Sequence, residues 1–177
     1  MFLALLNEKI KPLTARALSP ADYDELFLLH KGNVYYNACL SGGAVAPPAP
    51  LTKEQVLAGL AERPPDVRAE QKLYLGVFGQ GGLLACLDCL LGYPDKGTLF
   101  LGLLMVDARR HRQGVGAALT RALIAAARGA GYQKIRLACL TSNAPALLFW
   151  AKQGFREAAR KTTADGRAVI VMEILLS

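Results

Sequence analysis

The chain has 177 residues, 53% of them hydrophobic, and a formal net charge of +7 at pH 7. This length and apolar content exclude a disordered chain and favour a single domain over residues 1–177 with a sizeable core. No apolar run is long enough to span a bilayer, and Met1–Leu6 lacks the basic region and cleavage site of a signal peptide, so we expect a cytoplasmic protein without a membrane partner.

The N-terminal part begins with an expected extended segment over Lys9–Ala17. Ser19 is a suitable N-cap and Pro20 a suitable first residue for a helix that ends near Gly32. The chain therefore passes from a strand into a first helix.

The proline-rich stretch over 42–50 is interpreted as a loop inside the domain, because too few residues precede it to form an independent core. Thr52 followed by Gln55 has the sequence of a capping box. A second helix is expected from Thr52 to about Arg63, where two prolines stop it.

Beyond residue 70 the hydrophobic pattern changes to that of strands separated by glycine-containing turns, which predicts an antiparallel meander. A strand that follows a helix is expected to lie parallel to its predecessor through a right-handed crossover. The expected elements are strands at 72–78, 83–91 and 99–106, a helix to about Arg128, a strand at 134–140, a helix at 145–153 and a strand at 168–176, with a short strand after Phe155 left open.

The most informative segment is Val106–Leu119, which places Gly114 and Gly116 between an expected strand and an expected helix. Glycines at such a junction expose backbone N–H groups at the positive end of the helix dipole, and such a site commonly holds phosphate. The densest basic cluster of the chain lies beside them: Arg109, Arg110 and Arg112. A polyphosphate ligand therefore accounts for the positive charge better than nucleic acid does, and no nucleic-acid partner is expected.

Two common phosphate motifs do not fit this segment. A P-loop needs Lys followed by Ser or Thr after its last glycine, and neither stands there. A dinucleotide fingerprint needs a third glycine where Leu119 stands, and a βαβ unit that starts the sheet.

The segment Leu103–Phe155 resembles the acetyl-CoA-binding core of the GNAT N-acetyltransferase superfamily. In that family an apolar strand ends in valine, and Arg/Gln-x-x-Gly-x-Gly/Ala opens the next helix; here the motif reads His111-Arg-Gln-Gly-Val-Gly116. A second family element follows the next strand and is formed by Asn143, Ala146, Trp150, Gly154 and Phe155. Residues 16–23 also look like the first strand and helix of the family.

The resemblance implies an α+β, three-layer GNAT-like fold. Its sheet would be mixed and mostly antiparallel, with six or seven splayed strands and helices on both faces. Acetyl-CoA would enter between the strand that ends at Val106 and the strand at 134–140. The reaction would be direct attack of a primary amine, carried by a small molecule or a peptide, on the thioester. Tyr35 and Tyr36, expected in a loop, would shape the acceptor pocket, and a homodimer would be common in the family.

The resemblance also implies the contacts of acetyl-CoA. The N–H of Met105 or of a neighbour would stabilise the oxyanion, and Arg109 or Arg110 would meet the 3′-phosphate. The pyrophosphate would lie on the motif that His111 begins and the pantetheine on the preceding strand, so the expected binding residues are Met105, Val106, His111, Arg112, Gln113, Gly114, Val115, Gly116, Ala117, Asn143 and Trp150.

The chain departs from the family pattern at catalytic positions. Trp150 stands where many members carry a tyrosine that protonates the leaving thiolate, and an indole N–H is not a useful acid near pH 7. Phe100 and Gly102 stand where some members carry a general base. Asp88 is our candidate for a base or an amine anchor, against the alternative that it is an exposed strand residue.

The four cysteines do not indicate a metal or redox site. Cys86 and Cys89 have the spacing of a metal or redox pair, but they fall in an expected strand, where residues three apart point to opposite faces. The two histidines do not complete a zinc site, so no metal is expected and the cysteines are predicted to be free thiols.

Two other functions remain open from the sequence. The missing tyrosine and base allow an acyl-CoA-binding module with little or no turnover. The positive charge allows a nucleic-acid-associated protein, whose binding would depend strongly on salt.

Overall fold

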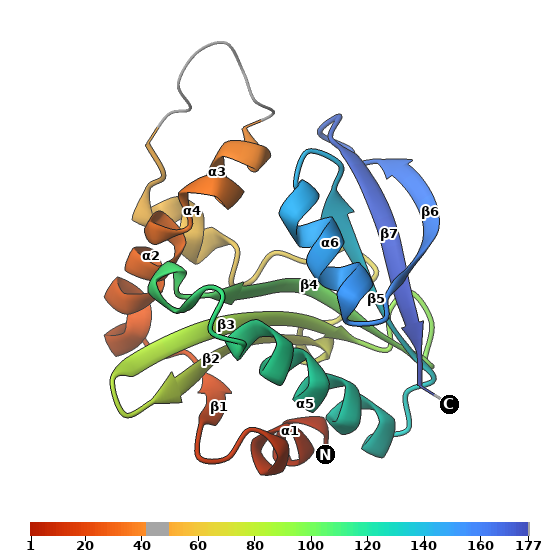
Figure 1. Cartoon of the computed structure of the whole chain (residues 1–177), viewed down its shortest axis with the longest axis horizontal. Helices are drawn as coiled ribbons and strands as arrows, with labels where there is room; N and C mark the ends of the chain where they lie inside the picture. The colour runs from red at the N-terminus through yellow and green to blue at the C-terminus, as the bar shows by residue number, and fades with distance from the viewer. Residues whose placement is uncertain (42–49, 177) are drawn as a thin grey trace.

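A computed structural model describes residues 1–41 and 50–176, and within them seven strands form one sheet with helices on both sides (Figure 1). The strands are β1 Thr14–Ala17, β2 Lys72–Gly79, β3 Gly82–Leu91, β4 Thr98–Val106, β5 Lys134–Leu140, β6 Arg156–Thr162 and β7 Ala168–Leu175. The helices are α1 Phe2–Lys9, α2 Tyr23–Gly32, α3 Val34–Leu40, α4 Lys53–Ala58, α5 Val115–Gly129 and α6 Ala144–Lys152, with short 3-10 turns at Pro20–Asp22, Ala69–Gln71 and Ala108–Arg110.

The strand order is β1-β2-β3-β4-β5-β7-β6, and every neighbouring pair is antiparallel except β4 with β5. This confirms the predicted meander, the parallel crossover and the mixed α+β fold class. The parallel contact is short, because β4 pairs with β5 only over Thr98–Leu101. Beyond that point β5 continues beside β7, so the sheet opens between β4 and β5 as expected for a splayed sheet.

A β-bulge lies where the two strands begin to separate. Asp88 of β3 pairs with Leu103 and Cys89 pairs with Leu101, so Gly102 has no partner in the β3–β4 ladder. A bulge of this kind bends its strand and re-aims nearby side chains. It places an exposed glycine backbone at the start of the opening.

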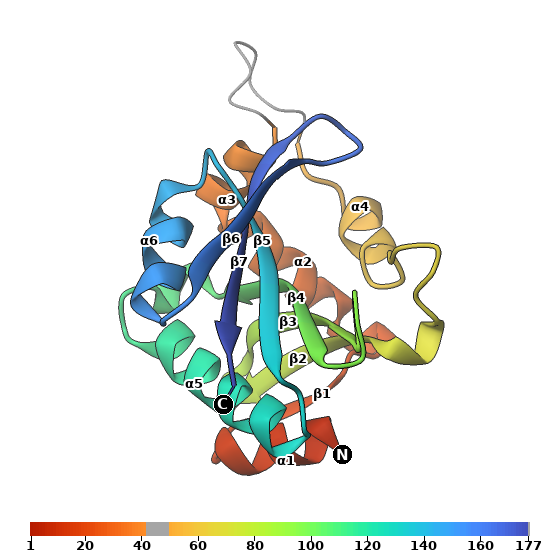
Figure 2. The same cartoon turned by 90° about the vertical axis from the view of Figure 1, so that its right-hand side faces the viewer.

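Each face of the sheet has its own hydrophobic cluster. The larger cluster joins the sheet to α1, α5 and α6 and includes Leu6, Leu123 and Trp150. The smaller cluster lies under α2 and α4 and includes Leu26 and Cys86. Figure 2 shows α5 and α6 on one side of the sheet and α4 on the other, which is the predicted three-layer arrangement.

The N-terminus differs from the sequence expectation. The extended segment expected over Lys9–Ala17 is wrong in its first part, because α1 ends at Lys9 and β1 starts only at Thr14. Phe2 and Leu6 are one helical turn apart and are buried in the α5 side of the core. The short apolar run forms a helix because α5 offers it a surface, and the local sequence does not show that surface.

The region between α2 and β2 also differs. Tyr35, expected in a loop, lies on α3, and the loop expected over 42–50 falls outside the described residues except for Pro50. The capping box of Thr52 is confirmed, since its Oγ1 accepts from the N–H of Gln55 at 3.3 Å. The helix it starts ends at Ala58, short of the expected Arg63.

The C-terminal half follows the prediction more closely. The short strand left open after Phe155 is a full strand, β6, at the edge of the sheet. Cys86 and Cys89 lie in opposite hydrophobic clusters, as their spacing on one strand predicted. All four cysteines are buried free thiols.

In the described ranges, no helix is long and apolar enough to cross a bilayer. The same residues contain no group of three His, Cys, Asp or Glu side chains arranged to hold a metal ion.

Candidate active site

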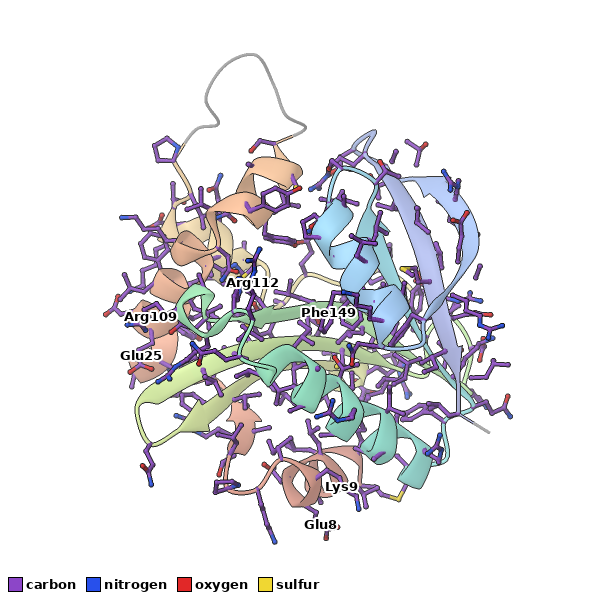
Figure 3. The ribbon with its side chains drawn as sticks, in the orientation of Figure 1. Glu8, Lys9, Glu25, Arg109, Arg112 and Phe149 are labelled. Carbon is purple, nitrogen blue, oxygen red and sulfur yellow. The ribbon has the colours of Figure 1, made fainter. Side chains whose placement is uncertain are left out.

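The segment before α5, residues 107–114, forms a tight loop that we call the α5 loop (Figure 3). Asp107 fixes its start by accepting hydrogen bonds from the N–H and the guanidinium of Arg109. Gly114 is the N-cap of α5 with a φ of +80°, and Arg112 also has a positive φ, of +60°. The first N–H groups of α5 have no intrahelical acceptor, so they remain free to bind an anion.

Val106, at the end of β4, holds this loop to the rest of the molecule. Its carbonyl oxygen accepts from Nε2 of His111 at 3.0 Å, which requires that nitrogen to carry a proton. The same oxygen accepts from Nδ2 of Asn33 at 3.1 Å, and Asn33 also donates to the carbonyl of Leu29. Sequence reasoning missed Asn33, because a single polar residue after a helix gives no signal of a partner on a distant strand.

The backbone of β4 presents its free polar groups at alternate residues. The N–H of Asp107 donates to the carbonyl of Leu84 at 2.9 Å and continues the β3–β4 ladder. Because hydrogen-bonded and non-hydrogen-bonded pairs alternate, the polar backbone groups of Met105 face β3. The N–H groups of Leu104 and Val106 face the opening, so the two neighbours of Met105 present backbone donors there.

Helix α6 borders the opening on the other side. Asn143 is its buried N-cap, and its Oδ1 accepts from the N–H of Ala146 at 3.2 Å. Phe149 approaches the start of α5 so closely that a Cβ on Gly116 would lie 3.4 Å from its ring (Figure 3). This distance is that of an ordinary van der Waals contact, so Phe149 borders the start of α5 without requiring a glycine there.

Trp150 is a packing residue in this structure. It is 8% exposed and packs edge-on between Phe149 and Phe155, with ring centroids 4.9 and 5.2 Å apart. An aromatic residue in such a cluster stabilises the core through contact area and ring geometry. That the indole stands at the acid position without acting as an acid stays a prediction.

A cavity of about 430 Å³ lies on the face of the sheet that carries α2 and α4. We call it the acceptor cavity, for the role that we propose for it. Its walls come from the segment after α4, from β2, β3 and β4, and from the turn between β3 and β4: Glu62, Arg63, Pro64, Lys72, Asp88, Leu90, Tyr93, Phe100 and Gly102. The cavity therefore contains Asp88. It also contains Phe100 and Gly102, the two β4 positions at which the resemblance would place a general base.

Asp88 is held in this cavity by a buried ion pair. Its Oδ2 accepts from Nζ of Lys72 at 2.7 Å, and the two side chains are 18% and 7% exposed. A Cβ on Gly102 would lie 3.0 Å from the same oxygen, so the carboxylate rests against the bulge. The alternative of an exposed strand residue is thereby ruled out.

The second carboxylate oxygen of Asp88 has an unsatisfied hydrogen-bonding capacity. Oδ1 is the one fully buried side-chain nitrogen or oxygen in the described part of the chain that lacks a hydrogen-bond partner. Such a group is costly unless a ligand or water satisfies it. Burial raises the pKa of Asp88, and the hydrogen bond from Lys72 opposes that rise.

A buried polar cluster lies nearby, beneath α2. Nε2 of His30 lies 3.0 Å from the hydroxyl of Tyr74, which donates to Sγ of Cys86 at 3.6 Å. Burial lowers the pKa of His30 to about 4 and raises that of Cys86 to about 12. Both groups are therefore neutral near pH 7, and the thiol is not a nucleophile.

Tyr36 extends from α3 toward the same region. It packs against the smaller hydrophobic cluster, and burial raises its pKa to about 12. Neighbouring Tyr35 is exposed, and its hydroxyl lies 3.5 Å from the carbonyl oxygen of Ser142, just before α6. Helix α3 thus reaches across the opening toward the loop that precedes α6.

Comparisons with known proteins agree with this fold. A model of the Acetyltransferase (GNAT) family matches residues 43–155. Among solved structures, an acetyltransferase from Thermus thermophilus is 20% identical with a TM-score of 0.68, covering 93% of this chain and 97% of that one. The ribosomal-protein-S18-alanine N-acetyltransferase from Escherichia coli is 21% identical with a TM-score of 0.63, covering 93% and 94%. A search of curated proteins finds no match.

Proposed function

This chain belongs to the GNAT acetyltransferase family, a family of acyltransferases, and we propose that it transfers the acetyl group of acetyl-CoA to a primary amine by direct attack on the thioester. The observation that carries the proposal is the opening between β4 and β5. The α5 loop lies at one end of this opening, and the acceptor cavity containing Asp88 lies beside it.

The backbone of the chain supplies the proposed acetyl-CoA site. The N–H groups of residues 112–117 bind the pyrophosphate at the start of α5. The carbonyl oxygen of Leu104 and the N–H of Val106 pair with the pantetheine in the manner of an added strand. Asn143 borders this arm at the start of α6.

The acceptor amine is proposed to bind at Asp88. The carboxylate rests on Gly102, and Gly102 is two residues from Leu104, a spacing of about 7 Å along a strand. Oδ1 accepts a hydrogen bond from the ammonium and takes up its proton, which frees the nitrogen lone pair for attack.

The remaining steps complete the transfer. The amine nitrogen bonds to the carbonyl carbon, and the N–H of Leu104 stabilises the oxyanion that forms. The carbon–sulfur bond then breaks, and the thiolate leaves with its electron pair. As the amide forms, the nitrogen loses a second proton; Trp150 supplies none to the thiolate, so this second proton passes from the nitrogen to the thiolate sulfur through water and gives CoA.

The packing of Trp150 also favours a second candidate function. Without an acid at this position, the chain would bind acyl-CoA and release little product. Tight binding of CoA without acetylation of any amine would support this second function.

The first experiment is calorimetric titration of the whole chain with acetyl-CoA, CoA and dephospho-CoA. Micromolar binding of acetyl-CoA, followed by CoA release with amines, supports the proposed transfer. Weaker binding of dephospho-CoA would indicate that the 3′-phosphate meets Arg109 or Arg110. No binding of acetyl-CoA would overturn the proposal.

A further inference from the structure

The acceptor cavity contains charged groups that a plain amine would leave unused. We propose that the acceptor is a small amino-acid-like zwitterion, whose ammonium binds Asp88 and whose carboxylate binds Arg63. The inference rests on the proposed function, because it names the class of amine that the same site acetylates.

The ammonium end is defined by Asp88. Lys72 satisfies one of its carboxylate oxygens, and the other has no partner among the described residues. Tyr93 and Phe100 line the same cavity, with their rings 5.8 Å apart in an edge-on arrangement. A carboxylate oxygen beside aromatic rings suits a primary ammonium.

The proposed partner of the carboxylate is Arg63, which lies at the border between the acceptor cavity and a neighbouring pocket and lines both. Its Nε donates to the carbonyl of Val67 at 3.0 Å and its Nη1 to the carbonyl of Ala61 at 3.1 Å. These bonds fix the plane of the guanidinium without neutralising its charge. No acidic side chain of the described residues forms an ion pair with it, and residues 42–49 contain none.

The segment that carries Glu62 and Arg63 is held to the sheet by Lys72. Nζ of Lys72 donates to the carbonyl of Glu62 at 2.6 Å as well as to Asp88, so one buried lysine ties the Arg63 segment to the sheet. The cavity volume of about 430 Å³ is near the lower end of small-ligand sites, which favours a compact molecule over a long chain.

Glu62 offers the opposite charge on the same wall and would favour a dicationic acceptor instead. Glu62 and Arg63 are both exposed, and the described structure gives no ion pair between them. The net charge of +7 favours the zwitterion of the two, because it repels a dication, whereas a zwitterion carries no net charge. Substituting Glu62 and Arg63 separately therefore tests which of the two charges binds the acceptor.

The experiment compares amines of equal length: 5-aminopentanoate, pentylamine and 1,5-diaminopentane, together with shorter amino acids down to glycine. For each, kcat/KM is measured from CoA release, and binding to the protein saturated with CoA is measured by calorimetry. The proposal expects at least one amino acid to bind and react about tenfold or more better than the amine and diamine of matching length.

Variants assign the effect to Arg63. Arg63→Gln should lower kcat/KM for that amino acid about tenfold to a hundredfold and leave the plain amine unchanged. Arg63→Lys should restore part of the loss because it keeps the charge. Glu62→Gln is the matched control, and it should not weaken amino-acid binding. Circular dichroism and acetyl-CoA binding check that each variant is folded.

Three results separate this inference from the proposed function. Preference for the diamine or the plain amine, or an unchanged Arg63→Gln, overturns the zwitterion and leaves acetyl transfer intact. Arg63-dependent binding of an amino acid without turnover supports the zwitterion and counts against transfer. Binding of neither acetyl-CoA nor any amino acid overturns both.

Discussion

The α5 loop and the acceptor cavity both border β4, but the loop is a site of backbone groups and the cavity is a site of side chains. The loop uses backbone N–H groups, a glycine N-cap and the start of one helix, all within a short stretch of sequence. The cavity uses side chains from β2, β3, β4 and the segment after α4. A backbone site tolerates side-chain changes, whereas a side-chain site should lose function when one charge is removed.

The largest effect is expected at the side-chain site, from Asp88→Asn. Losing the carboxylate that holds the amine and its proton should lower kcat/KM by about a hundredfold to a thousandfold, with acetyl-CoA binding unchanged. Steady-state kinetics and calorimetry measure the two effects. Wild-type rates in this variant would show that Asp88 takes no part in the reaction.

This variant needs a stability control, because it leaves Lys72 buried without a partner. Breaking a buried pair costs about 3–5 kcal/mol, while removing both charges costs much less. The double variant Asp88→Asn with Lys72→Met should therefore regain stability in denaturant unfolding and remain inactive. Recovery of activity in the double variant would show that Asp88→Asn acted only through folding.

The backbone site is tested by a matched pair of glycines at the two ends of α5. Gly114 and Gly131 have φ values of +80° and +87°, and a Cβ at either would meet nothing within 4 Å. Alanine at each should strain the backbone by a similar amount, about 1–2 kcal/mol, in unfolding experiments. Only Gly114→Ala should weaken acetyl-CoA binding, by about tenfold. Equal weakening by Gly131→Ala would mean that the effect is general to α5.

A smaller effect is expected in the pH profile of Lys72→Met. Burial raises the pKa of Asp88 and Lys72 opposes the rise, so removing Lys72 should raise this pKa further. The ionised carboxylate then forms only at higher pH, and the rising limb of kcat/KM should move up by about one pH unit. Lys134→Met is the control, because Lys134 pairs with exposed Asp95 outside the cavity, and its profile should not move.

The smallest effect on activity is expected from Trp150→Phe. Since the indole packs between Phe149 and Phe155, the variant should lose about 1–2 kcal/mol of stability and keep kcat within about twofold. Thermal unfolding and steady-state kinetics measure both. A large drop in kcat at unchanged acetyl-CoA binding would show that the indole N–H assists the leaving thiolate.

The sequence predicted the parts of this protein that depend on local patterns. The meander, the helix after Gly114 and the crossover to β5 follow from apolar periodicity and from glycines at strand and helix ends. The resemblance to the family also predicted the splayed sheet and its opening. These features are readable because neighbouring residues in the chain produce them.

Only the tertiary structure decided the composition of the acceptor cavity. The bulge that leaves Gly102 under Asp88 depends on how β3 and β4 align, and Lys72 reaches Asp88 through the β2–β3 register. Helix α1 forms against α5, and Arg63 lies in the cavity wall because α4 ends early. These contacts join residues far apart in the chain, and their geometry is set by packing and strand register, which the local sequence does not encode.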